Sequence, residues 1–247
     1  DASKVFRRIF SFSTPEALSE FGCVGLTFQR YCIPEPYDGV LPQLWANRDR
    51  RFLTIISQNK RPPLANNELY TERLRVIEHF ARTGSIDLYG LGWDGPPFRV
   101  GEHGVPARLL RVQRAVRKRL PNRGNGVWDD LIRSVYKGPV KSKHETMAGY
   151  TFAVCYENMV LEGWINEKIF DAFVVGTIPI FRGAPDVAQL IPATAFIDPR
   201  EFSSYEELGR FLRSLDKRAI DDYRESARAF MTSESYRPFS KQAFAEH

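Results

Sequence analysis

Several features that define common protein classes are missing from this chain. Its 247 residues contain no run of about 18 apolar residues that could span a membrane, and no apolar signal segment. Cysteine occurs only at Cys23, Cys32 and Cys155, and Cys155 lies in an apolar stretch where a buried thiol is expected. No Asn-x-Ser/Thr acceptor is present. These absences argue against a structural disulfide and favour a reducing bacterial cytoplasm over a Golgi-type compartment.

Groups of side chains that hold metals or act as nucleophiles are also absent from the sequence. The four histidines are scattered without ligand spacing, and no Cys-His or Ser-His-Asp arrangement is visible. We therefore assign no metal and no cofactor.

A moderate excess of positive charge is present. Lysine and arginine number 35 against 30 acidic residues, which gives a net charge of +5. Much of the excess lies in a predicted amphipathic helix over residues 107–120, which could lie on an acidic membrane surface or present an ordinary solvated face. A basic balance favours anionic partners such as nucleotides, acidic lipids or nucleic acid, without choosing among them.

Apolar segments with strand and helix patterns alternate along the chain. Strands are predicted at residues 52–57, 86–89, 151–156, 177–181 and 195–197. Helices are predicted at residues 66–82, where Asn66 or Asn67 would be the N-cap, 107–120, 164–175, 204–215 and from 220 onward. This alternation indicates an α/β, Rossmann-like parallel sheet with helices on both faces. Such sheets bind ligands at the carboxyl ends of their strands, where the loops after Ser57, Tyr89 and Tyr156 would meet.

Glu167 and Lys168 fall in the first turn of the predicted 164–175 helix. Backbone N–H groups are unpaired there and the helix dipole is positive, so a lysine at this point suits a phosphate. The neighbouring carboxylate can accept hydrogen bonds from a sugar diol. The pair therefore predicts a nucleotide-diphosphate site, the alternative being a solvated turn in which the glutamate only complements the dipole.

Five stretches in the second half of the chain follow one another in a specific order: Tyr150-Thr-Phe, Tyr156-Glu-Asn158, Trp164-Ile-Asn-Glu-Lys168, Val175-Gly-Thr-Ile-Pro-Ile180 and Gly183-Ala-Pro185. In this order they resemble the donor-binding domain of the family-ten glycosyltransferases, the α-1,3/α-1,4-fucosyltransferases. Residues 53–62, 72–75 and 86–90 resemble the bacterial branch of that family, so that the similarity covers roughly residues 50–235.

The resemblance implies a GT-B architecture, GDP-fucose as donor and inversion at the anomeric carbon during transfer to a saccharide hydroxyl. It places residues 1–45 as the remnant of an acceptor-side domain and linker, most of that domain being absent. Residues 46–247 would form the donor-binding domain, with a basic helical insertion at 98–140. The sequence has no Asp-x-Asp metal motif, which agrees with a metal-independent site. The general base of the family lies in the acceptor domain and is not assigned.

Roles in the donor site are carried over by position. The resemblance places Glu167 at the donor ribose, and Lys168 and Arg73 at the pyrophosphate, where both would stabilise the leaving group. The remaining donor-binding candidates lie in the matching loop or at a strand end: Asn158, Trp164, Asn166 and Ser57. Trp164 stands where the family has tyrosine, and Asn166, which can still cap the helix, stands where it has threonine.

Each of these positions also has a structural interpretation. Arg73 could pair with Glu72 on a helix surface, Asn158 could cap a loop, and Trp164 could be a core aromatic at the helix entry. Glu157 could end the strand and orient nearby backbone, or belong to the site.

Two other functions stay open. The chain could use a different nucleotide sugar on the same architecture, or could be a non-catalytic module that binds nucleotide or polyanion. No nucleic-acid motif is present, so nucleic acid is not expected as a partner. We expect a cytoplasmic protein, with peripheral contact to an acidic membrane as a further possibility.

Overall fold

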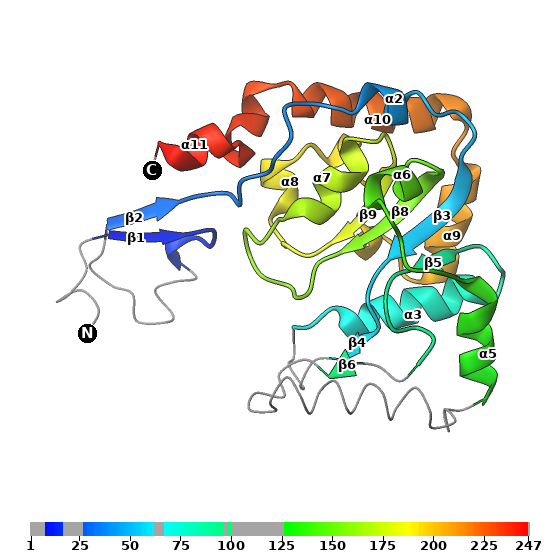
Figure 1. Cartoon of the computed structure of the whole chain (residues 1–247). Helices are drawn as coiled ribbons and strands as arrows, with labels where there is room; N and C mark the ends of the chain where they lie inside the picture. Colours follow the sequence, from blue (N-terminus) through cyan, green and yellow to red (C-terminus); the bar gives the residue numbers. More distant parts are fainter. Residues whose placement is uncertain (1–7, 17–26, 62–66, 96–97, 100–125, 247) are drawn as a thin grey trace.

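The computed structural model describes residues 8–16, 27–61, 67–95, 98–99 and 126–246 (Figure 1). The predicted basic helix at 107–120 and Cys23 lie outside these ranges. Cys155 is buried as expected, and Cys32 and Cys155 are free thiols. Among the described residues, no helix has both the length and the apolar character needed to cross a bilayer.

The centre of the fold is a five-stranded sheet in which every pair of neighbours is parallel. Its strands are β3 (Arg51–Ile56), β5 (Asp87–Tyr89), β7 (Tyr136–Gly138), β8 (Tyr150–Tyr156) and β9 (Ile178–Arg182). They lie in the order β7-β5-β3-β8-β9, so the chain runs outward to one edge and then returns to continue on the other side of β3. The switch point between β3 and β8 is where sheets of this topology bind ligands.

Helices cover both faces of the sheet, as the alternating pattern predicts (Figure 1). One face packs against α3 (Tyr70–Ala81), α5 (Gly126–Val135) and α9 (Tyr205–Ser214) around buried residues such as Leu53, Ile77 and Leu208. The other packs against α6 (Lys143–Met147), α7 (Glu167–Phe173) and the C-terminal part of α10 (Lys217–Met231), around residues such as Phe170 and Phe230. Strand β8, which lies between β3 and β9, is buried along almost its whole length, because both of its faces are covered.

Shorter elements complete the described part of the chain. They are β1 (Arg8–Ser11), β2 (Thr27–Arg30), α2 (Pro42–Trp45), β4 (Lys60–Arg61), β6 (Phe98–Arg99), α8 (Val187–Leu190) and α11 (Lys241–Ala245), with 3-10 turns η2 (Ala193–Ala195), η3 (Pro199–Glu201) and η4 (Glu234–Phe239). β1 pairs with β2 and β4 with β6, each as a separate parallel pair.

The structure departs from the sequence prediction at several elements. Helix α3 begins at Tyr70 rather than after Asn66 or Asn67, because the Asn67 side chain donates to the Val160 carbonyl instead. The Glu68 carboxylate accepts from the Thr71 amide at 2.9 Å in place of an asparagine cap. Residues 195–197 form no strand; only Ile197 bridges to Ile180. Residues 126–138, the end of the predicted 98–140 insertion, form α5 and the sheet strand β7.

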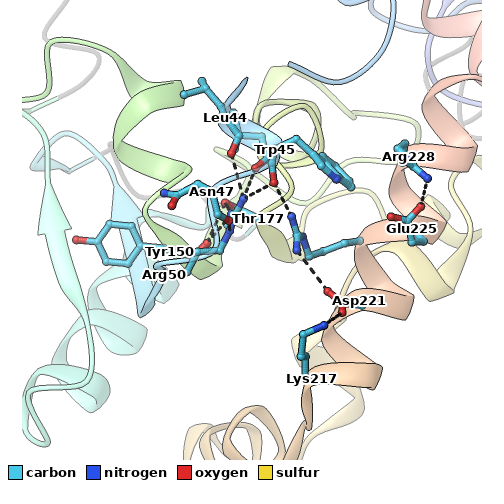
Figure 2. Close-up of polar contacts among 12 residues, drawn as sticks. Leu44, Trp45, Asn47, Arg50, Tyr150, Thr177, Lys217, Asp221, Glu225 and Arg228 are labelled. Atoms are coloured by element: carbon cyan, nitrogen blue, oxygen red, sulfur yellow. Dashed lines mark hydrogen bonds and ion pairs between the residues drawn. The ribbon is translucent and has the colours of Figure 1, made fainter. Parts of the chain in front are cut away.

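A single arginine, Arg50, joins several chain segments at the amino end of the sheet (Figure 2). Its guanidinium donates to the carbonyls of Val175 at 2.7 Å, Asn47 at 2.8 Å and Tyr150 at 3.1 Å. It also donates to the carbonyls of α2 residues and to the Thr177 hydroxyl. Burial, followed by the nearby charge of Arg224, lowers the pKa of this guanidinium.

The N-terminal pair β1–β2 lies beside the loop that leads into α7. Arg30 and Asp186 form an ion pair at 2.5 Å, and the other Asp186 oxygen accepts from the Gly163 amide at 2.8 Å. The ring of Phe12 meets the Trp164 ring edge-on at a centroid distance of 4.8 Å. These contacts fix the 158–166 loop from the side opposite the sheet.

Candidate functional site

A pocket of about 310 Å³ opens at the switch point, beyond the carboxyl ends of β3 and β8. Its floor includes Ile55 and Val154 from the two strands, and its walls come from α3, α6 and α7. The polar and charged side chains around it are Ser57, Gln58, Lys60, Tyr70, Arg73, Lys143, Asn158, Glu167, Lys168 and Asp171. Five of the seven predicted donor-site residues therefore line one cavity; Trp164 and Asn166 do not.

Lys168 is held by three oxygens at the start of α7. Its Nζ donates to Asn166 Oδ1 at 2.7 Å and to Glu157 Oε2 at 2.8 Å, and Glu167 Oε1 lies at 3.3 Å. The side chain is 23% exposed, so the ammonium is partly desolvated and points into the pocket from a fixed position. A cation fixed in this way suits an anionic ligand whose oxygens can replace a weakly held partner.

Glu157 is the buried partner behind this lysine. Its side chain has no exposed surface, and its second oxygen accepts from the Asn166 amide at 3.1 Å. Burial raises the pKa of Glu157, while the charge of Lys168 and its hydrogen bond oppose that rise. The sequence left the role of Glu157 open; the structure shows that it orients both a side chain and the backbone at the helix start.

Arg73 comes from α3 and reaches across to the end of β8. Its Nη2 donates to the carbonyls of Tyr156 and Glu157, both at 2.6 Å, and to Asn158 Oδ1 at 3.0 Å. The residue is only 8% exposed, and burial lowers the pKa of its guanidinium. The expected alternative of a surface pair with Glu72 is wrong, since Glu72 instead accepts from Arg75, Arg182 and Tyr205.

Glu167 differs from these buried groups because its side chain is 49% exposed at the pocket wall. Apart from the 3.3 Å contact with Lys168, the described residues give its carboxylate no hydrogen-bond donor. A carboxylate placed this way can turn toward a ligand and accept hydrogen bonds from vicinal hydroxyls. Helix α7 begins at Glu167 and is seven residues long, so Glu167 and Lys168 occupy its first turn as predicted.

Three other predicted residues have mainly supporting positions. Asn158 lines the pocket, as its donor-binding interpretation requires. Its side-chain oxygen also accepts a hydrogen bond from Arg73, which is a structural role. Ser57 lies at the end of β3, where Gly90 packs so tightly that a Cβ on Gly90 would be 1.9 Å from the Ser57 carbonyl oxygen. Asn166 occupies the N-cap position of α7, but its side chain makes no capping bond and accepts from Lys168 instead. The expected capping role is therefore wrong.

Trp164 does not reach the pocket. Its ring packs against Phe12 and its indole Nε1 is buried without a hydrogen-bond partner among the described residues. The structural interpretation of Trp164, an aromatic at the entry to α7, is the one that the geometry supports. Trp164 stands where the resembled family has tyrosine, which is also aromatic. The sequence therefore gave no direct sign that this ring turns away from the pocket.

Lys143 and Asp171 form a second charged pair on the pocket wall, which the sequence did not predict. Lys143 Nζ lies 2.5 Å from Asp171 Oδ2, and the other Asp171 oxygen contacts His144 Nε2 at 2.9 Å. The Tyr37 hydroxyl also donates to Asp171. Lys143 lies on the short helix α6, which has no long apolar period to reveal it, so its closeness to α7 becomes evident only in three dimensions.

The arrangement can accommodate a ligand that carries adjacent negative charges and hydroxyl groups. Lys168 and Arg73 can donate to anionic oxygens, and Glu167 can accept from a diol. The position at the topological switch point is the usual place for a nucleotide in an open α/β sheet.

Solved structures share this architecture. An α,α-trehalose-phosphate synthase (UDP-forming) from Burkholderia vietnamiensis is 11% identical with a TM-score of 0.55, over 95% of this chain and 57% of that chain. Anabaena HepE in complex with UDP and glucose is 13% identical with a TM-score of 0.55, over 97% of this chain and 62% of that chain. The fold is therefore that of the GT-B glycosyltransferases.

Sequence comparison adds a family match. Residues 126–238 match the model of glycosyltransferase family 10 (fucosyltransferase), C-terminal part. Over 84 residues the chain is 33% identical to the α-(1,3)-fucosyltransferase FucT of Helicobacter pylori, covering 34% of this chain and 18% of that protein. Over 82 residues it is 34% identical to an α-(1,4)-fucosyltransferase of Arabidopsis thaliana, covering 32% and 20%. The matched part thus spans about a fifth of these curated relatives.

Proposed function

We propose that this chain is the donor-binding part of an inverting glycosyltransferase that moves fucose from GDP-fucose to a saccharide hydroxyl. The observation that carries the proposal is the convergence of Lys168, Arg73 and Glu167 on one pocket at the switch point of the sheet. The family-ten match of residues 126–238 supports fucose as the sugar and a GDP-linked donor. Residues 46–247 would form the donor domain, which agrees with β3, the first strand of the five-stranded sheet in sequence, beginning at Arg51. Residues 1–45 would belong to the acceptor side.

In the proposed reaction the bond between the anomeric carbon and the β-phosphate oxygen breaks. Its electron pair stays on that oxygen, while the acceptor oxygen bonds to the opposite face of the anomeric carbon. The acceptor proton passes to a general base, which the resemblance places in the acceptor domain. Negative charge on the leaving diphosphate is then the charge that this pocket must stabilise.

Lys168 and Arg73 would share that task from opposite walls of the pocket. Lys168 offers a partly exposed ammonium that is already oriented by Glu157 and Asn166. Arg73 donates hydrogen bonds through Nη2 to oxygens at the end of β8. Its Nε and Nη1 make no hydrogen bond to another described residue. Because α7 is only seven residues long, the proposal depends on these side chains rather than on the dipole of the helix.

The test is calorimetric titration of the chain with GDP, UDP, ADP and CDP, for wild type and for Lys168→Ala. We expect GDP to bind most tightly, and Lys168→Ala to weaken it about 10- to 100-fold, since a hydrogen bond to a charged group contributes about 1.5–3 kcal/mol. Lys217→Ala is the matched control, because Lys217 is a 78% exposed lysine on α10. Equal GDP affinity in the Lys168 and Lys217 variants would remove Lys168 from the site.

The second candidate is transfer from another nucleotide sugar. It is favoured by the shared fold with Anabaena HepE, whose structure contains UDP and glucose. The same titration separates the two candidates, since binding of UDP in preference to GDP would support the second and contradict the first. The proposal includes a cytoplasmic location and peripheral contact of residues 107–120 with an acidic membrane. It invokes no cofactor and no metal.

A further inference from the structure

A fully buried carboxylate lies directly behind the Lys168 ammonium. Glu157 places Oε2 at 2.8 Å from Lys168 Nζ and Oε1 at 3.1 Å from the Asn166 amide nitrogen. Both carboxylate oxygens are therefore directed at the start of α7, one at a side chain and one at the backbone. Glu157 is not among the residues that line the pocket, so it acts on the site only through its neighbours.

The neighbouring strand β9 and the turn after it pack closely against Glu157. Its amide donates to the Arg182 carbonyl at 2.8 Å, which continues the ladder between β8 and β9 by one residue. Gly183 lies in the turn that follows β9, and a Cβ on Gly183 would lie only 2.5 Å from Glu157 Cγ. The neighbouring strand and its turn thus contact both the backbone and the side chain of Glu157, and its carboxylate is held by the Lys168 ammonium and the Asn166 amide.

A buried ion pair of this kind contributes little to stability, because desolvation of the two charges offsets their attraction. Its value lies in geometry. We propose that Glu157 is the positioning residue of this site: it holds the Lys168 ammonium and the Asn166 backbone in the orientation that a diphosphate requires, without touching the ligand. This inference rests on the function proposed above for the same pocket.

The three partners of Lys168 then have different roles. Glu157 and Asn166 are buried and stay in place, whereas Glu167 is 49% exposed and lies at the longer distance of 3.3 Å. A phosphate oxygen replaces Glu167 at the ammonium, and the released carboxylate becomes available to the ribose hydroxyls. Glu157 thereby determines which of the three contacts is exchanged.

The test compares Glu157→Gln with wild type by displacement of a fluorescent GDP analogue, using inorganic pyrophosphate and guanosine as separate competitors. We expect pyrophosphate and GDP to weaken at least about tenfold in the variant, while guanosine changes less than twofold. Glutamine keeps the shape but cannot accept from both Lys168 and Asn166 without turning its amide NH₂ toward one of them. Glu145→Gln, an exposed acid on α6, is the matched control.

A merely structural role would lower the affinity for guanosine and for pyrophosphate equally, and that result would overturn the proposal. A second check is the double variant with Lys168→Met. If Glu157 acts through Lys168, then Glu157→Gln should have less than a twofold effect on pyrophosphate binding once Lys168 is absent. A full tenfold effect in the Lys168→Met background would contradict positioning through that lysine.

If Glu157→Gln does not fold, Glu157→Asp takes its place, since it keeps the charge but withdraws the carboxylate from Lys168. Pyrophosphate affinity must then fall while guanosine affinity holds, and an equal loss of both overturns the inference. The failures of the two proposals are distinguishable. A wild-type chain that binds none of the four nucleoside diphosphates removes both, whereas a Glu157 variant that retains full GDP affinity removes only the inference about Glu157.

Discussion

Ionisation of Glu35 should control how stability depends on pH. Glu35 is 3% exposed in the segment between β2 and α2, and its amide donates to the Phe239 carbonyl at 2.7 Å. Burial, followed by the nearby negative charges, raises the pKa of Glu35 from its ordinary 4.5 to about 8. The charged groups that face it are Glu167, Asp171 and Glu157, which raise the pKa, and Lys143, which lowers it.

The sign follows from this rise. A carboxyl whose pKa is higher in the folded chain than in the unfolded chain stabilises the fold fully below pH 4.5, and this contribution is lost as pH rises through about 8. At 1.36 kcal/mol for each pH unit, the difference between the two pKa values corresponds to at most about 5 kcal/mol. Because the effective dielectric constant is high even at buried protein sites, we expect about half of this, about 2 to 3 kcal/mol.

The perturbation is Glu35→Gln, which keeps the size of the side chain and removes its proton equilibrium. Urea unfolding at pH 5, 6.5, 8 and 9 should show that the free energy of unfolding of wild type, relative to the variant, falls by about 2 to 3 kcal/mol across this range. Glu234→Gln, an exposed acid in η4, is the control and should leave the pH dependence unchanged. A constant difference between wild type and Glu35→Gln from pH 5 to 9 would refute the reasoning.

Three further substitutions test other parts of the structure. Gly90→Ala should lower the free energy of unfolding by about 2 to 4 kcal/mol in urea, because Gly90 has φ of +129° and its Cβ would collide with the Ser57 carbonyl; an unchanged value would contradict the close packing. Arg50→Met should cost about 3 to 5 kcal/mol by the same measurement, since it leaves several buried carbonyls without a donor; a loss below 1 kcal/mol would show that these carbonyls find other donors. Glu167→Gln should weaken GDP about 5- to 20-fold but strengthen inorganic pyrophosphate about 2- to 5-fold in calorimetry, because the exposed competitor for Lys168 loses its charge; a change of the same sign for both ligands would contradict the exchange.

Four of the five sheet strands and the start of α7 were predictable because their signals are local, whereas β7 was not predicted. Residues 151–156 are almost uniformly apolar, which is typical of a strand covered on both faces, and the structure places β8 there. Glu167 and Lys168 follow a loop and precede an apolar run, so their place in the first turn of a helix could be read directly. The fold class is confirmed by the parallel order of the strands and by the shared GT-B architecture.

Contacts between distant segments were not predictable in the same way. The sequence shows Arg73 beside Glu72 but does not show that Arg73 reaches the end of β8, because that contact spans 83 residues or more. Glu157 follows β8, and the direction of its side chain depends on Gly183, which lies in the turn after the adjacent strand β9. Trp164 turns toward Phe12, which lies about 150 residues earlier in the chain. In each case the deciding neighbour has no periodic relation to the residue it positions.

The cationic side chains of the pocket differ in whether a carboxylate neutralises them. Lys168 is paired with buried Glu157, and Lys143 is paired with buried Asp171, so neither lysine adds a net positive charge to the cavity. Arg73 has no carboxylate within ion-pair distance among the described residues, and its acceptors are carbonyls and one amide oxygen. In the proposed site the attraction for a diphosphate would therefore come chiefly from Arg73 and from Lys60, which lines the same pocket and has no ion pair with another described residue, while Lys168 would contribute direction rather than charge. A pocket built in this way selects a ligand by where its oxygens lie, because part of its positive charge is already balanced before the ligand arrives.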